Sequence, residues 1–566
     1  MNKFDELITT YSYLFDRAYH ISVDGVRKGK YEDGEFKPDS KYSFVSSKPI
    51  LPTAILDNLD NDVQKVEVAW WESDKAKWVR TVTNRETLVN SSKITKLADR
   101  GVPVGSDNSK AMSTYFNSVL CEFDGKLPRK PARSVMGWCE LDERTLFMPY
   151  TDLIDFDGGE RYKDDFKSIR SKGKLSDWVE RIGPLRANSM EIRLMMDASF
   201  ASPLIWLINE NPFVFHLYGN SGSGKTVSMY IAASIWGDPA PGRLTKSMNT
   251  TINAMMERAA FLNSFPFCGD ELQTIKSRWT GTYDSLIMQI TEGINRGRMK
   301  DNALQEMLSW KCAFIFTGEE PAVRSTSGGG VVNRCIQVEI KQPLFDTTGP
   351  ESGNNYVNFV LNHYGTAGQP YIERVMAINA GLAPVDYSII GLYKRYYSEL
   401  INGDTTEKQA GAMALMMTAD KIAQDLFWPD MDMDLQVGWV REYLATKANV
   451  NVAERAYKHL LGIIGVNSMN FTNSSRVIWG KADDDNEPTR IDFIKTALEE
   501  QMRLAGFEFD AVKKPWNAKG YIEYNDRAQS YMFLTRINGV PTWCVRINLP
   551  KTQPELTDYN GPVPFN

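Results

Sequence analysis

A glycine-rich stretch, GNSGSGKT, at residues 219–226 is the segment whose residue types and spacing most directly suggest chemistry. It matches the pattern G-x-x-x-x-G-K-[ST], in which glycines let successive backbone N–H groups face phosphate oxygens at the start of a helix. In this pattern the ammonium of Lys225 contacts the β and γ phosphates, and the hydroxyl of Thr226 reaches Mg²⁺. We therefore predict a site for ATP and Mg²⁺, rather than a glycine-rich loop without a ligand. The predicted loop consists of Gly219, Asn220, Ser221, Gly222, Ser223, Gly224, Lys225 and Thr226.

Two carboxylates follow the apolar stretch FPFC, roughly fifty residues after the glycine-rich loop. Asp270 is predicted to hold Mg²⁺ through its water shell, and Glu271 to polarise the attacking water as general base. The alternative is a pair of surface carboxylates at the end of a strand. The loop upstream favours the catalytic interpretation, because hydrolysis needs both elements.

A third apolar stretch, AFIF, ends in TGEE, where a polar side chain can sense the γ-phosphate and orient water. Thr317 is the predicted sensor, with Glu319 and Glu320 as alternatives. Further along the chain, Arg334 directly precedes the apolar stretch CIQVEI. Its guanidinium could reach the γ-phosphate held by a neighbouring subunit, which is the arginine-finger role. A salt-bridged arginine at a strand edge is the alternative.

Basic residues surround a glycine in the segment EGINRGRMKDNALQEMLSW, between the two carboxylates and the TGEE strand. Arg296, Arg298 and Lys300 would lie on a hairpin that faces the pore of a ring. There they would contact the phosphates of one threaded DNA strand. An exposed turn whose basic side chains contact only water is an equally supported interpretation of the same residues.

The C-terminal segment is locally basic in an acidic protein, with ten Lys or Arg against seven Asp or Glu between Arg490 and Lys551. Lys513, Lys514 and Lys519 cluster before a predicted hairpin, and together with the preceding helices they outline a winged helix. This arrangement favours duplex DNA binding, although many winged helices serve protein contacts. A helix is predicted over IDFIKTALEEQMRLAG, with Ile491, Ile494, Leu498 and Met502 on one face.

The elements that must position these residues follow from the apolar pattern. Strand-like stretches (PFVFHLY, AAFLNSFPFCGDE, WKCAFIFTGE and CIQVEI) alternate with helical segments, as a parallel α/β sheet requires. The predicted fold class is therefore α/β, with a three-layer P-loop ATPase core. The predicted domains are an N-terminal mostly β module (1–165), the ATPase core with a helical lead-in (166–345), a helical lid or linker (346–480) and a C-terminal winged-helix DNA-binding domain (481–566).

Four tryptophans in the N-terminal module, Trp70, Trp71, Trp78 and Trp138, alternate with valines on short strands. Base stacking is one interpretation, but core positions and cross-strand pairs are favoured for tryptophans on strands. The methionine-rich segment GAMALMMTADKIAQDLF is likewise predicted to be a core helix rather than a binding groove.

Composition limits the other possibilities. The 566 residues include 65 basic and 71 acidic side chains, a net charge of −6, so DNA binding must depend on local basic patches. Six cysteines without a C-x-x-C pair indicate neither a zinc site nor a disulfide framework. The first residues lack the apolar core of a signal peptide, and no apolar run reaches the length of a membrane span. We expect a cytoplasmic protein with no membrane partner.

Several stretches resemble those of one known group: GWCELDERTLFMP, SDWVERI, FHLYGNSGSGKTVSMYIAASIWGDP, FCGDE and IFTGEEP. Between about Lys41 and Arg334 the chain is similar to the AAA+ helicases related to the MCM replicative helicases that mobile genetic elements encode. That group includes replication initiator helicases of staphylococcal pathogenicity islands and helicases of staphylococcal cassette chromosomes. The phrase AASIWGDP is more specific to it than the phosphate loop.

The resemblance implies a homohexameric ring that hydrolyses ATP between subunits and translocates 3′ to 5′ along single-stranded DNA. It also implies a self-loading replication initiator that recognises its origin through the C-terminal domain. By the same resemblance, Lys225, Thr226, Asp270 and Glu271 match the phosphate-loop and metal motifs, Arg334 the arginine finger, and Lys300 the hairpin tip. The chain departs from MCM proteins in having TGEE where they carry an asparagine before proline, and in lacking zinc-binding cysteines in the N-terminal module.

Two other classes share the loop. A packaging or transport ATPase would grip duplex DNA or protein without separating strands, and a nucleotide-switched regulator would use ATP only to reshape a DNA-binding platform. A fused packaging nuclease needs a carboxylate metal cluster, which the sequence does not reveal. A switch does not need the basic hairpin, so the helicase is favoured.

Overall fold

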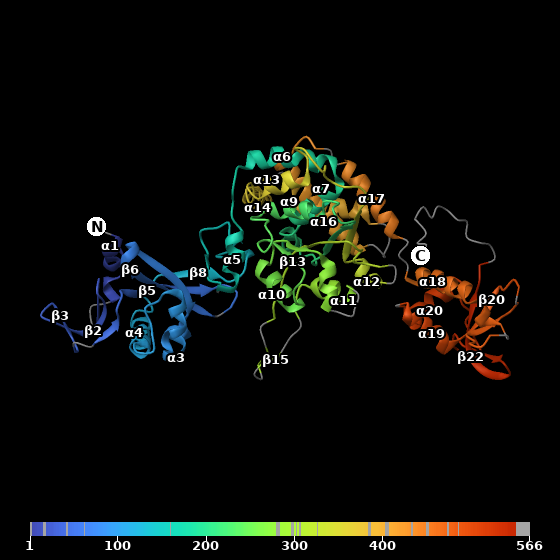
Figure 1. Cartoon of the computed structure of the whole chain (residues 1–566), viewed down its shortest axis with the longest axis horizontal. Coiled ribbons are helices and arrows are strands. Elements are labelled where there is room, and N and C mark those ends of the chain that lie inside the picture. The colour runs from blue at the N-terminus through green and yellow to red at the C-terminus, as the bar shows by residue number, and fades with distance from the viewer. Residues whose placement is uncertain are drawn as a thin grey trace.

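Three packed cores follow one another along the chain. The computed structural model describes residues 3–14, 18–40, 43–61, 63–158, 160–278, 283–295, 299–300, 303–304, 307–324, 327–382, 387–401, 407–431, 434–448, 452–472, 475–484, 486–505 and 507–550. Within these residues, the large buried clusters lie between Tyr11 and Leu127, between Met136 and Leu444, and between Ala453 and Ile547. Figure 1 shows the corresponding N-terminal, central and C-terminal bodies side by side along the long axis.

The N-terminal body contains two sheets and is rich in strands, as predicted. One sheet has the order β11-β8-β5-β6-β7, and in the other β2 pairs with β1, β3 and β4. Their bounds are β1 (Tyr19–Ser22), β2 (Gly25–Glu32), β3 (Glu35–Pro38), β4 (Phe44–Ser46), β5 (Ile50–Asn58), β6 (Gln64–Glu72), β7 (Lys77–Asn84), β8 (Arg129–Arg133) and β11 (Asp155–Phe156). The helices are α1 (Lys3–Thr10), α2 (Arg85–Val89), α3 (Ser91–Ile94) and α4 (Ser109–Glu122).

The tryptophans occupy core and cross-strand positions. Trp70 is buried, and Trp71 faces Trp78 across β6 and β7 with 5.5 Å between ring centroids. Phe4 of α1 stacks on Trp78 at 5.6 Å. The preference for a core role over base stacking is thus confirmed for these rings, because their faces are already occupied by neighbouring side chains.

The hairpin of β9 (Gly137–Leu141) and β10 (Arg144–Met148) packs into the central core. The indole N–H of Trp138 donates to the carbonyl of Pro203 at 2.7 Å, and the N–H of Met136 donates to the carbonyl of Phe261 at 2.8 Å. The sequence-based module 1–165 includes this hairpin, whereas its contacts belong to the central body. The alternating apolar pattern that predicts strands does not reveal which core buries them.

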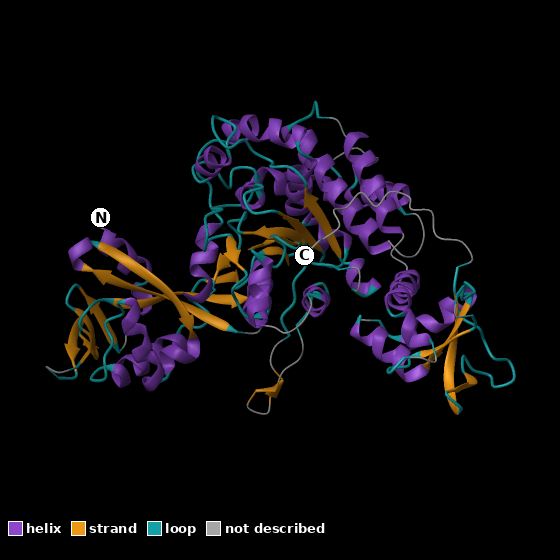
Figure 2. Ribbon diagram, turned by 45° about the vertical axis from the view of Figure 1, so that its right-hand side comes forward, coloured by secondary structure: helices purple, strands orange, loops and turns teal. Residues whose placement is uncertain are grey.

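A five-stranded parallel sheet with the order β13-β14-β17-β12-β18 forms the centre of the molecule. Figure 2 shows this sheet among the helices of the central body. The four predicted strands are present, although the AAFL portion of the second lies in a helix and β13 was not predicted. The strands are β12 (Val214–Gly219), β13 (Thr245–Ser247), β14 (Phe267–Asp270), β17 (Phe314–Gly318) and β18 (Cys335–Ile340).

Helices surround the sheet and extend to the C-terminal body. They are α5 (Glu160–Ser168), α6 (Leu175–Asn188), α7 (Met190–Ala201), α8 (Leu204–Ile208), α9 (Lys225–Ser234), α10 (Ile252–Leu262), α11 (Asp284–Ile290), α12 (Gly329–Val332), α13 (Gly353–Val360), α14 (Gly368–Asn379), α15 (Ile389–Leu400), α16 (Glu407–Phe427) and α17 (Asp434–Ala448). The methionine-rich face of α16 is buried at Met413, Met416 and Met417, so its predicted core role is confirmed. No helix among the described residues combines the length and apolarity needed to cross a membrane.

A buried ion network joins α6, α7 and α16. Arg186 contacts both Asp197 and Asp420, and Arg193 donates to Asp420 at 2.7 Å. All four side chains are at most 2% exposed. Because each charge has lost its water, each depends on its partners for compensation. The network therefore ties the helix that leads into the sheet to the later helical layer.

The C-terminal body has helices followed by a hairpin, as predicted, with one correction. Residues 490–494 form a strand and not the first turn of a helix, because Ile491 and Phe493 alternate into the core while β20 pairs with β19 and β22. The elements are α18 (Val452–Val466), β19 (Gly480–Ala482), β20 (Arg490–Ile494), α19 (Lys495–Leu504), α20 (Phe509–Ala518), β21 (Phe533–Ile537) and β22 (Val540–Asn548). Asn538 and Gly539, both with positive φ, make the predicted turn between the last two strands.

Removing one carboxylate from the buried network should destabilise the central body strongly. We expect Asp420→Ala to lower the free energy of unfolding by about 3–5 kcal/mol, because two arginines lose their buried partner. Glu399→Ala is the control, since Glu399 meets Arg441 at 3.3 Å in a partly exposed pair worth about 1 kcal/mol or less. Denaturant titration would measure the free energy of unfolding of both variants. Equal losses would show that the buried network contributes no more to stability than an exposed ion pair.

Candidate functional site

The phosphate-loop pattern lies where the sequence predicts it, between the carboxyl end of β12 and the start of α9. Gly222 and Gly224 adopt φ values of 77° and 98°, which favour glycine. A Cβ on Gly224 would also lie 2.6 Å from a ring carbon of Phe345. The loop therefore needs glycine at residue 224 both for its backbone conformation and for its close contact with the following segment.

Lys225 begins α9 and reaches back over the loop. Its ammonium donates to the carbonyl of Gly219 at 2.8 Å and to that of Asn220 at 2.7 Å. Burial lowers the pKa of Lys225, and the nearby carboxylates of Glu319, Asp270 and Glu271 oppose that shift. The ammonium thus lies over the phosphate loop at the N-terminus of α9, where anions are favoured.

Asp270 lies between two hydroxyl groups from neighbouring elements. The Thr226 hydroxyl is 3.1 Å and 3.2 Å from the two carboxylate oxygens, and the Thr317 hydroxyl donates to one of the same oxygens. The arrangement follows from the sheet, because β14 and β17 are parallel neighbours that end at the same edge. A carboxylate beside a threonine hydroxyl provides the hard oxygen ligands that Mg²⁺ prefers.

Glu271 follows β14 in an unusual backbone conformation. Its φ is 60°, in the left-handed region that costs a residue with a side chain on the order of 1–3 kcal/mol. Its N–H donates to the Thr317 hydroxyl at 3.2 Å, which helps to hold this conformation. The exposed Glu271 side chain lines a cleft of about 380 Å³ together with Lys225, Thr226 and Asp270.

Thr317 was predicted to sense the γ-phosphate, and the structure places it beside the site but 1% exposed. Its hydroxyl donates to Asp270 and accepts from the Glu271 N–H, so it connects the two carboxylate residues. Of the two alternatives, Glu319 lines the cleft, whereas the Glu320 side chain lies 3.5 Å from Arg324.

Gln273 is a cleft residue that sequence reasoning did not identify. Its side-chain oxygen is buried and has no hydrogen-bond partner within the described part of the chain. It lines the same cleft as Glu271 and Glu319. The only feature of the sequence that could have identified Gln273 is its position two residues after Glu271. A glutamine at that spacing matches none of the motifs used to predict the site.

Arg334 lies at the amino ends of the parallel strands, whereas the cleft lies at their carboxyl ends. Its carbonyl accepts from the N–H of Val214, the first residue of β12, and β18 begins at the next residue. β12 is six residues long, so the two ends of the sheet lie roughly 20 Å apart. The Arg334 guanidinium donates to the carbonyl of Gly330 at 2.9 Å and cannot reach the phosphate loop of its own chain.

The predicted basic hairpin is present in the backbone. β15 (Met299–Lys300) pairs with β16 (Ala303–Leu304), and Figure 1 shows β15 below the central body. Lys300 therefore lies beside the turn. Its side chain, and residues Arg296 and Arg298, are outside the described residues.

The three predicted C-terminal lysines differ in their surroundings. Lys513 pairs with Asp510 at 2.6 Å and Lys519 with Glu454 at 2.5 Å. Lys514 lies exposed on α20. Two of the three charges are thus partly compensated within the chain, which a count of basic residues does not reveal.

The phrase AASIWGDP contributes packing behind the loop. The Trp236 indole N–H donates to the Ser199 hydroxyl at 2.9 Å, and Asp238 accepts from Arg170 at 3.2 Å. A Cβ on Gly237 would lie 2.1 Å from the carbonyl oxygen of Ser168. These residues fix α9 against α5 and α7 and have no direct part in the cleft.

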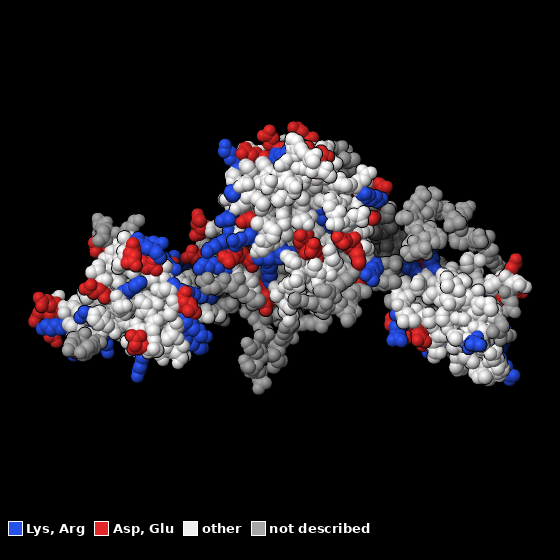
Figure 3. All heavy atoms as spheres, viewed as in Figure 1, with Lys and Arg blue, Asp and Glu red and all other residues white. Residues whose placement is uncertain are grey.

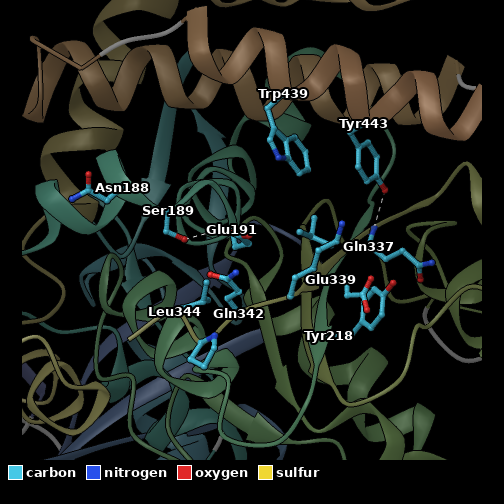
Figure 4. Close-up of a pocket in the computed structure, with 13 residues that line it drawn as sticks. Asn188, Ser189, Glu191, Tyr218, Gln337, Glu339, Gln342, Leu344, Trp439 and Tyr443 are labelled. Carbon is cyan, nitrogen blue, oxygen red and sulfur yellow. Dashed lines mark hydrogen bonds between the residues drawn. The ribbon is translucent and has the colours of Figure 1, made fainter. Parts of the chain in front are cut away.

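A second cleft of about 710 Å³ lies beyond β18, between that edge strand and α17 (Figure 4). Trp439 and Tyr443 of α17 point into it, and the Tyr443 hydroxyl accepts from the N–H of Gln337 at 3.1 Å. Pro343 lines both clefts, so the segment after β18 separates them. The sequence did not predict this cleft, because its walls come from distant segments.

The described residues contain no group of three His, Cys, Asp or Glu side chains suited to a metal ion, and none of their six cysteines forms a disulfide. The cluster around Asp270 is the remaining candidate, because one carboxylate and one hydroxyl fit an ion that keeps most of its water and binds phosphate.

Loss of the Thr317 hydroxyl should destabilise the site before any ligand is considered. We expect Thr317→Val to lower the free energy of unfolding by about 1–3 kcal/mol, because the half-buried Asp270 carboxylate and the Glu271 N–H lose a partner. Thr317→Ser keeps the hydroxyl and should cost less. Thermal unfolding monitored by circular dichroism would compare them, and equal losses would assign the effect to packing of the methyl group.

Comparison with known proteins places this site in a wider context. The family described as "Cch helix turn helix domain" matches residues 451–551, and no curated protein matches the chain. The solved structure described as "SCCmec type IV Cch - active helicase" is similar over 94% of this chain and 97% of that chain, with a TM-score of 0.71 and 15% sequence identity. A structure of the "NrS-1 C terminal region" covers 87% of this chain and 96% of its own, at 11% identity and a TM-score of 0.33.

At 15% identity, the first structural likeness shows that the two chains share a fold. A second family model, described as "Domain of unknown function (DUF927)", matches residues 19–305. This match covers just over half of the sequence and includes the phosphate loop, Asp270 and Glu271. The chain therefore belongs to the DUF927 family.

Proposed function

We propose that this protein is an ATP-dependent DNA helicase of a mobile genetic element. Its ring would be a homohexamer that loads itself at a replication origin and translocates 3′ to 5′ on single-stranded DNA. The observation that carries this proposal is the cleft in which Lys225, Thr226, Asp270 and Glu271 meet at the carboxyl edge of a parallel sheet. Such an edge is where ligands bind in α/β folds.

The residues of the cleft divide the work of hydrolysis. Backbone N–H groups of the loop and the Lys225 ammonium bind the phosphates, while Thr226 and Asp270 hold Mg²⁺. When bound, the ion neutralises charge that develops on the phosphate oxygens. Glu271 accepts a proton from the attacking water, and Thr317 fixes the relative positions of the two carboxylate residues.

The architecture supports an AAA+ core within this proposal. The loop-bearing strand β12 lies inside the sheet between β17 and β18, and the carboxylates come from β14, the next strand beyond β17. The helical layer from α13 to α17 would be the lid. The structure described as an active helicase shares its fold with this chain, which supports this assignment.

Two features support action as a ring on DNA. Arg334 lies a strand's length from its own cleft, so its proposed role as an arginine finger requires a neighbouring subunit's nucleotide. The β15–β16 hairpin lies below the central body in Figure 1 and would present Lys300 to a threaded strand. The order of helices α19 and α20 followed by the β21–β22 hairpin supports a winged helix for duplex DNA.

Unwinding of a fluorescent forked DNA tests the function. We expect the wild type to separate strands with ATP from a 3′ tail, and Lys225→Ala to lose both nucleotide binding and unwinding because the phosphates lose their counter-charge. Glu271→Gln should bind ATP but turn over at least a hundredfold more slowly, as expected for loss of a general base. Fluorescence change and phosphate release would be measured together.

The same assay separates the alternatives. Hydrolysis stimulated by DNA without strand separation would contradict the helicase proposal and favour a duplex translocase. Normal turnover by Glu271→Gln would remove that residue from the role of general base. Unwinding only from a 5′ tail would reverse the proposed polarity.

Subunit mixing tests the placement of Arg334. Arg334→Ala should abolish hydrolysis alone, yet regain part of it when mixed with Lys225→Ala subunits, because an intact finger would then face an intact phosphate loop. Mixed samples would be compared with each variant alone by phosphate release. Absence of any recovery would contradict action across the subunit interface.

A further inference from the structure

The β21–β22 hairpin carries an apolar face that its own body does not cover. Leu534 and Trp543 lie opposite each other in the register and are 61% and 53% exposed. Arg536 and Pro541 form the next outward pair toward the turn, and both are exposed. Because alternate residues of a strand share a face, these four side chains form one surface, which we call the hairpin face.

The opposite face holds the hairpin firmly in place. Ile537 and Cys544 are buried, and the Thr535 hydroxyl donates to Asp492 of β20 at 2.7 Å. Arg546 lies 3.9 Å from the ring centre of Phe533. These contacts anchor the opposite face, and on the outward face burial ends at Val545, so packing within the C-terminal body does not explain a large aromatic residue at Trp543.

No other described part of the chain covers the hairpin face. Figure 1 shows β22 at the end of the C-terminal body that lies away from the central body. β21 is also the edge strand of its sheet. Apolar side chains exposed on an edge strand favour aggregation or mark a binding site.

The charge of the hairpin favours a nucleic acid. The two strands, FLTRI and VPTWCVRIN, contain two arginines and no acidic residue. Arg546 is paired with Glu523 at 3.1 Å, whereas Arg536 belongs to the outward surface. In Figure 3 the lower right end of the C-terminal body shows Lys or Arg side chains among uncharged residues. A tryptophan beside an arginine suits a base and its adjoining phosphate.

The size of the hairpin face argues against a stable protein partner. A standard interface buries about 800 Å² on each partner and uses some 20–30 residues a side. Four side chains supply only part of that area. A nucleobase needs a single aromatic ring to stack on, which the hairpin face provides.

We propose that Trp543, flanked by Leu534, stacks on an unpaired DNA base where single-stranded DNA meets duplex, with Arg536 on the adjoining phosphate. Inside a duplex the faces of the bases are covered by their neighbours, and only their edges are open in the grooves. A base face becomes available at a fork or in a single strand. This inference rests on the proposed function and adds a contact at the point where strands separate.

Equilibrium binding of the full chain without nucleotide tests the stacking. Fluorescence anisotropy would compare a labelled fork, a single strand and a blunt duplex of the same sequence. We expect Trp543→Leu to weaken binding to the fork and the single strand about tenfold, as loss of one stacked base predicts, and to leave the blunt duplex unchanged. Trp543→Phe keeps an aromatic face and should retain most of the affinity.

Two further variants guard against effects on folding. Leu504→Ala is the matched control, because Leu504 is 73% exposed at the end of α19 and lies outside the hairpin face. It should bind all three DNA forms like the wild type. Arg536→Gln changes an exposed charge and should lower the salt dependence of fork binding by about one phosphate contact.

The outcomes are distinguishable. If the wild type binds none of the DNA forms, the proposed function fails together with this inference. If the wild type binds and Trp543→Leu matches it on every form, only the inference is wrong. An equal loss on the blunt duplex would indicate groove binding instead. A changed oligomeric mass of Trp543→Leu without DNA would show that the hairpin face contacts another copy, which also overturns the proposal.

Discussion

The contact of one carboxylate with two hydroxyl groups organises the candidate site. Asp270 ends β14, Thr317 lies on the neighbouring strand and Thr226 lies in the first turn of the helix after the phosphate loop, so three elements meet at one side chain. This meeting is possible only because the strands are parallel and end at the same edge of the sheet. The left-handed backbone of Glu271 depends on the same contact, since its N–H is held by the Thr317 hydroxyl. Strain of this kind persists where the surroundings over-determine the conformation.

Packing behind the edge keeps this geometry in place. Trp236, Gly237 and Asp238 fix the helix that carries Lys225 against the elements before the sheet. The buried charges of Arg186 and Asp420 then link those elements to the later helices. Buried ion pairs add little net stability compared with apolar packing, but they tolerate few alternative arrangements because an unpaired buried charge is costly. The helical layer is thereby held in one orientation toward the cleft.

The sequence predicted the strands of the sheet and the residues at their ends because both follow local patterns. Continuous apolar stretches mark buried parallel strands, and a glycine-rich loop must lie next to a helix N-terminus to be of use. It failed where a local pattern fits two structures. Ile491 and Ile494 fit a helical period, yet residues 490–494 form a strand, since pairing with β19 and β22 decides the outcome. The sequence also did not reveal that the hydroxyl of Thr317, the predicted γ-phosphate sensor, connects Asp270 with Glu271.

By itself, the sequence determined the phosphate loop, four of the five strands of the central sheet and the residue types at the carboxyl ends of those strands, because each depends on neighbours in the chain. Only the tertiary structure decided which side chains meet. It placed Gln273 in the cleft and Arg334 at the end of the sheet away from that cleft. It also paired Lys513 and Lys519 with acidic side chains and left Trp543 exposed. These outcomes depend on strand register and on contacts between distant segments, and neither is encoded in the spacing of residues within one segment.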